Sequence, residues 1–244
     1  GVKCLAMMRC ASKPEKSRFQ PAPKGWRLSN SKPKIAVYGD SREAFDLRAL
    51  LSAHELLGQG ERASLHVIAP HPFETALPEV PDPKVYLRRA SWHAGPLDNW
   101  LWVDDAQGAA DWLQAHQPGP ALIAVGYERL APFYQLKDQV LLIRSRKIPH
   151  PAKPNKGDIW TVSGPFTVAQ EVETLRANGV AVIIAHDAGG AGGWPKFAAA
   201  RQLGLPVVLL KRKAWPNGPM FDSVEGLARY INSTLGLDLG ANGA

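Results

Sequence analysis

Four glycines in five positions make 189–193 (Gly-Gly-Ala-Gly-Gly) the most informative stretch of this sequence. It follows the apolar run 180–185 and precedes Pro195, a residue suited to the first turn of a helix. Glycines here let a ligand approach the backbone, and amides at the helix start could hold a phosphate or a carboxylate. The alternative is a flexible loop. Because about two or three residues suffice to join a strand to a helix, we favour the ligand role, with Gly190 and Gly192 nearest the ligand.

A second turn that could bind a ligand is 39–42 (Gly-Asp-Ser-Arg), directly after the apolar run 34–38. In open α/β sheets a nucleotide phosphate sits beyond the carboxyl end of the first strand. The G-x-G-x-x-G spacing of dinucleotide-binding proteins is absent, however. Asp40 or Ser41 can equally cap the helix that follows. A cofactor contact and a plain helix cap therefore both stay open for this turn.

His71 lies in the rigid turn 70–73 (Pro-His-Pro-Phe), after an expected strand. An imidazole there could move a proton or hydrogen-bond a substrate, although a surface histidine is the simpler alternative. The turns 126–129 and 164–166 follow other expected strands in the same way. The sequence has no G-x-S-x-G motif and no H-x-x-x-H pair, so a serine hydrolase and a zinc site of that type have no support.

The formal net charge of +7 is concentrated at the N-terminal end of the 244 residues. Residues 1–34 contain nine basic residues and one acid, whereas the rest carries 20 basic and 21 acidic residues. A protein that binds the phosphate backbone needs a basic face on its folded domain, so we expect no nucleic-acid partner. Residues 1–33 are expected to form a disordered basic tail. Because the chain opens on Gly1, we also expect that its native start lies elsewhere.

Both cysteines, Cys4 and Cys10, lie in this tail, so the rest of the chain has neither a disulfide nor a cysteine-based metal site. No apolar run reaches the roughly 18 residues that a membrane span needs. A cytoplasmic protein without a membrane partner is therefore expected.

After residue 33, short apolar runs alternate with helical patterns, which predicts parallel sheets flanked by helices. The run 180–185 is apolar without alternation, as in a strand buried on both faces. We expect two α/β domains, 34–117 and 118–236, with ligands at the carboxyl ends of the strands. The expected strands are 34–38, 64–69, 84–88, 121–125, 139–144, 158–163, 180–185 and 206–211. The expected helices are 44–54, 104–114, 167–178, 195–203 and 223–235.

In this order the segments resemble the precorrin-6A reductase family of cobalamin biosynthesis, which includes the cobalt-precorrin-6A reductases. The closest similarity is C-terminal, in SGPF (163–166), HDAGGAGGWPK (186–196) and AAARQLGLPVVLLKR (198–212). Weaker similarities are GDSREA (39–44), PHPF (70–73), RASW (89–92) and AVGYERLAPF (124–133). The resemblance covers about residues 34–235. About 30 residues separate Gly39 from His71, fewer than is usual in the family, so the first domain is expected to be shortened.

The resemblance implies two Rossmann-like domains with a ligand cleft between them. It also implies an NADPH-dependent oxidoreductase, with NADH as the alternative, that reduces a C=C or C=N bond of precorrin-6A or its cobalt form. His71 is then the candidate catalytic residue, and Gly39, Asp40, Ser41 and Arg42 are the candidate cofactor-binding residues. The candidate substrate-binding residues are Arg89, Gly126, Tyr127, Gly164, Phe166, Asp187, Gly189, Gly190, Gly192 and Lys196.

The implied partners are the tetrapyrrole and other enzymes of the cobalamin pathway, and no metal site is implied. A cofactor that supplies the chemistry explains why the sequence shows no catalytic triad. The alternative is a divergent homologue that binds a tetrapyrrole without turning it over.

Overall fold

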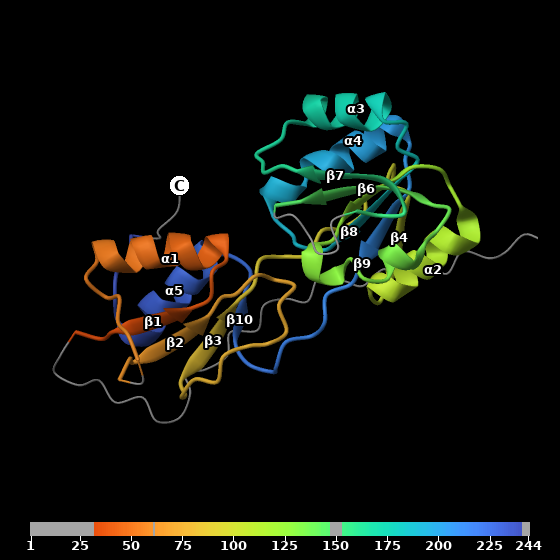
Figure 1. Ribbon diagram of the computed structural model, residues 1–244. Helices are drawn as coiled ribbons and strands as arrows, with labels where there is room; N and C mark the ends of the chain where they lie inside the picture. The colour runs from red at the N-terminus through yellow and green to blue at the C-terminus, as the bar shows by residue number, and fades with distance from the viewer. Residues whose placement is uncertain (1–31, 61, 147–152, 241–244) are drawn as a thin grey trace, which may run out of the picture.

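The computed structural model describes residues 32–60, 62–146 and 153–240, so nearly all of the expected tail lies outside it. A four-stranded parallel sheet forms the first unit (Figure 1). Its strand order is β1 (Ile35–Tyr38), β2 (Leu65–Ile68), β3 (Lys84–Leu87) and β10 (Met220–Phe221). Two helices, α1 (Arg42–Ala53) and α5 (Val224–Leu235), pack their apolar side chains on one face of this sheet. On the other face the aromatic ring of Trp215 packs against Tyr86 and Ile68.

A six-stranded parallel sheet forms the second unit. Its strand order is β4 (Trp100–Val103), β9 (Val207–Leu210), β8 (Val182–His186), β5 (Ala121–Ala124), β6 (Val140–Ser145) and β7 (Lys156–Thr161). Helix α2 (Ala106–His116) covers one face, and α3 (Val168–Ala177) and α4 (Pro195–Leu203) cover the other. With helices on both faces, β9 and the first four residues of β8 are apolar and buried, and His186 ends β8.

The helix ends follow local chemistry. At the start of α1 the side chain of Ser41 accepts the amide of Ala44, and at the start of α3 Thr167 and Gln170 form a capping box. Helix α4 instead begins with Pro195 and has no side-chain cap. We find no helix in the described ranges whose length and apolar character would let it cross a membrane.

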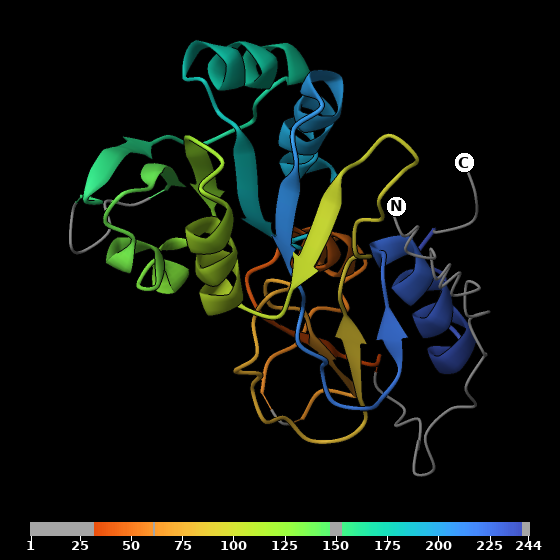
Figure 2. The ribbon, with the colours of Figure 1, turned by 90° about the vertical axis from the view of Figure 1, so that its right-hand side faces the viewer.

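The two units are not divided where the sequence suggested. The expected boundary near residue 118 leaves β4 and α2 in the first domain and α5 in the second, whereas β4 pairs with β9 and α5 packs on the first sheet. Figure 2 shows β4 beside β9, and β10 beside β3 in the other sheet. The second unit is thus a continuous segment between β3 and β10. Hydrophobic patterning predicts strands but not their neighbours, so the boundary has to be corrected.

Most predicted elements agree with the structure within a few residues, but β4 and β10 were not predicted. Strand β4 has the sequence WLWV, which reads as an aromatic cluster rather than an alternating strand. Its Trp100 packs on Phe197 of α4, with ring centroids 5.3 Å apart. Strand β10 has only two residues, too few to give a periodic signal.

Candidate functional site

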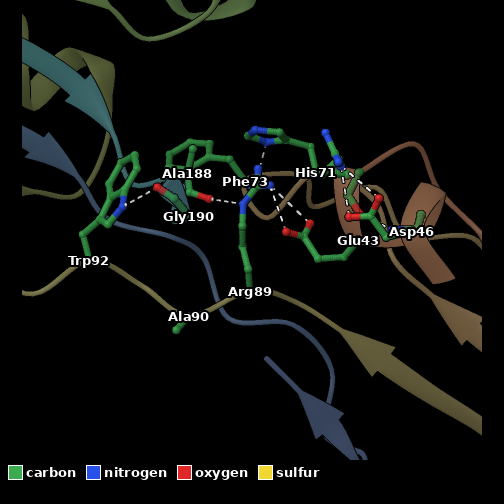
Figure 3. A network of polar contacts seen from close by, with 12 residues as sticks. Glu43, Asp46, His71, Phe73, Arg89, Ala90, Trp92, Ala188 and Gly190 are labelled. Atoms are coloured by element: carbon green, nitrogen blue, oxygen red, sulfur yellow. Dashed lines mark hydrogen bonds and ion pairs between the residues drawn. The ribbon is translucent and has the colours of Figure 1, made fainter. Parts of the chain in front are cut away.

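The carboxyl ends of the two sheets meet where the units join (Figure 3). His71 follows β2 and contacts His186 at the end of β8. Arg89 follows β3, and its Nε donates a hydrogen bond of 2.7 Å to the carbonyl of Ala188, two residues beyond β8. The structure therefore brings together the histidine turn, Arg89 and the glycine-rich loop. The sequence places the histidine turn and the glycine-rich loop at strand ends and gives Arg89 only through the family resemblance, and it does not show that the three meet.

Asp187 and Arg212 form a buried ion pair at the base of the glycine-rich loop, with 3.1 Å between Nε and Oδ2. The side chain of Asp187 is 2% exposed and that of Arg212 is 8% exposed. The guanidinium of Arg212 also donates to the carbonyls of Arg89 (2.6 Å) and Ala90 (3.0 Å). Asp187 further accepts the backbone amide of Trp92 at 3.3 Å. The carboxylate of Asp187, a candidate ligand contact, is thus occupied by Arg212 and by the segment that follows β3.

The glycines of the loop fall into two groups. At Gly189 (φ +66°) a Cβ atom would lie 2.2 Å from the carbonyl oxygen of Ala90, and at Gly190 (φ +74°) one would lie 3.0 Å from Cδ of Arg89. At Gly192 a Cβ would meet nothing within 4 Å. The first two glycines are therefore required by the packing of the chain on itself. Only Gly192 faces open space, beside the uncapped start of α4.

Arg89 links the glycine-rich loop to the first turn of α1. Its Nη1 lies 3.1 and 3.2 Å from the two carboxylate oxygens of Glu43, while its Nε reaches Ala188 (Figure 3). Both side chains of the Arg89–Glu43 pair are largely buried. The expected cofactor turn 39–42 comes immediately before Glu43, so a single guanidinium connects this turn with the glycine-rich loop.

Within the expected cofactor turn, Gly39 adopts φ +119°, and a Cβ there would lie 2.4 Å from the backbone of Ala69. Ser41 is buried and caps α1, which confirms the cap interpretation for that residue. Asp40 is exposed. The exposed Arg42 forms an ion pair of 2.9 Å with Asp46, one turn further along the helix. Arg42 is therefore the cation of this turn that a ligand can reach.

The two histidines form an aromatic contact in the middle of the junction. Their ring centroids lie 5.6 Å apart, and the ring of Phe73 lies 4.9 Å from that of His186. The guanidinium of Arg129 stacks 4.5 Å above Phe73. Nδ1 of His71 accepts the amide of Phe73 at 3.3 Å, which places the proton of the neutral ring on Nε2. Nδ1 of His186 is buried without a hydrogen-bond partner among the described residues.

Burial and nearby cations keep both imidazoles neutral. Burial, followed by the charges of Arg89 and Arg129, lowers the pKa of His71 to about 4, and the carboxylate of Asp40 opposes the shift only weakly. Burial lowers the pKa of His186 to about 3, with His71 and Arg129 acting in the same direction. The junction thus offers neutral imidazoles surrounded by cationic groups, an arrangement suited to an anionic ligand.

We expect the folded state to lose stability as the pH falls from about 6.5 to about 4. Between these values the unfolded chain binds a proton at His71 that the folded chain does not, so unfolding becomes easier with acidity. The contribution of neutral His71 to the free energy of unfolding is fully present above pH 6.5. Below that pH the free energy of unfolding falls by up to about 1.4 kcal/mol per pH unit. Urea unfolding at several pH values compares the wild type with His71→Gln. The same pH dependence in both proteins would contradict the assignment.

The remaining candidates lie along the carboxyl edge of the second sheet. Gly126 (φ +83°) begins the short 3-10 turn η1 (Tyr127–Arg129), which presents Arg129 to Phe73 while Tyr127 is exposed. Phe166 lies further along this edge and does not contact the histidines; its ring stacks on Arg144 at 4.8 Å. Gly164 lies in the same loop as Phe166. Lys196 lies in the first turn of α4, and burial lowers the pKa of its ammonium to about 8.

Sequence reasoning missed several charged residues of this region. They are Glu43, Arg129, Arg144, Glu171 and Arg212. The sequence did contain a signal for Arg144 and Arg212, since each is a charged residue at the end of an apolar run. Arg144 is the last residue but one of β6, and Arg212 lies two residues beyond β9. A charge at such a position needs a partner or a ligand. Across the described ranges, no group of three or more His, Cys, Asp and Glu side chains could hold a metal ion.

Comparisons with known proteins agree on one family. The family described as Precorrin-6x reductase CbiJ/CobK matches residues 78–232. The chain is 33% identical over 144 residues to the precorrin-6A reductase of Rhodobacter capsulatus, covering 59% of this chain and 57% of that protein. It is 31% identical over 154 residues to the precorrin-6A reductase of Rhodococcus erythropolis, covering 61% and 59%. The match thus spans less than two thirds of these relatives.

A solved structure, "CobK precorrin-6A reductase", superposes with a TM-score of 0.72 at 26% identity. The superposition covers 84% of this chain and 100% of that chain. The expected fold class, α/β with two parallel sheets flanked by helices, is confirmed by this likeness and by the strand pairing.

Proposed function

This chain belongs to the precorrin-6x reductase family CbiJ/CobK, and from that premise we propose that it reduces a corrin-pathway tetrapyrrole with a nicotinamide cofactor. The substrate is precorrin-6A or its cobalt form, and the product is the dihydro compound. The nicotinamide supplies a hydride to one atom of a C=C or C=N bond, and a proton completes the reduction at the other. We place this activity in the cytoplasm beside other enzymes of cobalamin biosynthesis, in keeping with the role of the family.

The observation that carries this proposal is the cationic surrounding of the two neutral histidines. The charges of Arg89, Arg129 and Arg146 all lower the pKa of His71, and the carboxylate of Asp40 opposes them, while Glu43 pairs with Arg89. A tetrapyrrole of this pathway carries many carboxylates, and such a ligand is stabilised by an excess of guanidinium groups. With its proton on Nε2, neutral His71 can donate a hydrogen bond to the bound macrocycle.

The turn 39–42 fits the phosphate end of a nicotinamide cofactor. It lies at the carboxyl end of β1 and at the start of α1, where the helix dipole favours an anion. Arg42 is the exposed cation of this turn, and an arginine here suits the 2′-phosphate of NADPH. We therefore favour NADPH over NADH, with Gly39, Asp40, Ser41 and Arg42 around the nucleotide.

The direct test is oxidation of NADPH by the purified protein in the presence of cobalt-precorrin-6A, followed by absorbance of the reduced nicotinamide. Turnover supports the reductase. Saturable tetrapyrrole binding without NADPH oxidation would identify a non-catalytic binding protein instead. Absence of both would contradict the proposal.

His71→Ala is expected to lower kcat/KM about 10- to 100-fold, because the transition state loses one hydrogen bond to a polar group of the substrate. His54→Ala is the matched control, since His54 lies at the far end of α1, away from the junction. Steady-state kinetics of both variants, with thermal unfolding to check their folds, provides the comparison. Unchanged kinetics in His71→Ala would remove this residue from the site.

A further inference from the structure

An open pocket of about 310 Å³ lies on the α3 side of the second sheet, away from the histidines. It is lined by residues of β6, β7, α3 and the loop that precedes α3. These residues are Arg144, Trp160, Val162, Phe166, Thr174 and Asn178. The walls combine two aromatic rings with one cation. This composition suits a ligand that has an apolar part and a negatively charged group at its end.

Arg144 is the cation of this pocket, and its own fold does not satisfy it. Its side chain is only 10% exposed, and Nη1 lies 2.7 Å from Oε1 of Glu171. Nε of Arg144 and Oε2 of Glu171 are both buried and have no hydrogen-bond partner among the described residues. A buried charged donor without an acceptor is costly, and in native proteins such groups usually have a partner. The Arg144–Glu171 ion pair therefore leaves one donor and one acceptor unpaired.

The charges around Arg144 also leave a positive excess. The carboxylate of Glu171, 2% exposed, faces Arg144 and acts on Lys196 as well. Two cations thus share one anion in a region of low exposure. One carboxylate from a ligand in the pocket would balance the charges of this set.

We propose that this Arg144 pocket is a carboxylate subsite, which takes one acidic arm of a ligand with its aliphatic stem between Trp160 and Phe166. This assignment rests on the proposed function, because the acidic arm is taken to be one of the carboxylate side chains of the tetrapyrrole substrate. At about 310 Å³ the pocket lies at the lower end of the roughly 300–1,000 Å³ of small-molecule sites. It therefore holds an arm and the adjoining edge, while the body of the macrocycle lies outside.

The test uses uroporphyrin III, a tetrapyrrole with acetate and propionate arms, as the probe. Its binding is followed by quenching of tryptophan fluorescence. The variant Arg144→Met/Glu171→Met removes the ion pair without leaving either charge buried alone. The matched control, Arg201→Met/Asp98→Met, removes a second ion pair (2.7 Å) of the same unit, outside the pocket. We expect the first variant to bind uroporphyrin about 10- to 100-fold more weakly and the control to bind like wild type.

Two further results separate this inference from the reductase activity. Suppose that the wild type binds uroporphyrin through Arg144 but does not oxidise NADPH with cobalt-precorrin-6A. This result would contradict the proposed function and would still support the subsite. Equal affinities of wild type and Arg144→Met/Glu171→Met would overturn the subsite, whatever the enzyme activity. The subsite would also be overturned if both double variants lost affinity for uroporphyrin equally, or if the wild type did not bind uroporphyrin.

Discussion

Replacing Asp187 by alanine is expected to lower the free energy of unfolding by about 3–5 kcal/mol. The substitution leaves Arg212 buried without its counter-charge, and a buried unpaired charge is among the most destabilising defects in a protein. The backbone amide of Trp92 loses its acceptor in the same change. Urea-induced unfolding of the whole chain, followed by far-UV circular dichroism, measures the loss.

A neighbouring ion pair gives the matched control. Asp104 pairs with Lys211 at 2.8 Å, one residue before Arg212, but the two side chains are 86% and 52% exposed. Asp104→Ala should therefore cost at most about 1 kcal/mol, as exposed pairs do. If Asp187→Ala is as stable as Asp104→Ala, the Asp187–Arg212 pair does not have the structural role assigned to it.

Gly189→Ala is expected to cost about 2–4 kcal/mol. The residue has φ +66°, a conformation that alanine adopts only with strain, and the new Cβ would lie 2.2 Å from the carbonyl oxygen of Ala90. That carbonyl already accepts a hydrogen bond from Arg212, so it cannot move away without breaking the contact. Thermal unfolding of the variant, compared with wild type, measures the effect.

Gly192→Ala is the control, because a Cβ at this position meets nothing within 4 Å. We expect it to unfold within about 1 kcal/mol of wild type, the usual cost or gain of such a change at a permissive site. The pair of variants also separates the two roles of the loop. A Gly192→Ala protein with normal stability and weakened uroporphyrin binding would indicate that the ligand lies against this part of the backbone. Equal stability of the two variants would contradict the packing assigned to Gly189.

The sequence predicted the fold class because its strongest signals are local. The apolar runs of β8 and β9 and the amphipathic pattern of α5 can be recognised from neighbouring residues alone. Helix α4 was placed at its observed bounds because Pro195 and Gly204 mark its ends. The division into units was wrong because it depends on which strands pair. Strands β3 and β10 pair with Met220 opposite Tyr86, 134 residues apart along the chain, in a register that no local pattern encodes.

The site could be predicted only in outline. The sequence predicts ligands at the carboxyl ends of the strands, and in the structure His71 and Arg89, which follow two of these strands, contact the segment that follows β8. The hydrogen bonds and ion pairs of individual side chains could not be predicted, because their partners come from segments that are distant in the sequence. The sequence predicts Asp187 and Gly189 as ligand contacts. In the structure Asp187 forms an ion pair with Arg212, and Gly189 packs against the carbonyl of Ala90.

The insertion of the second unit between β3 and β10 means that two chain segments, not one, run between the units. These segments are tied to each other: Arg88 donates to the carbonyl of Lys213 at 2.9 Å, and Arg212 donates to that of Arg89. Because these two segments are hydrogen-bonded to each other, neither can shift at the junction without the other. Arg89 belongs to one of these segments and also binds Glu43 and Ala188, so a shift of that segment would displace the glycine-rich loop and the start of α1 together.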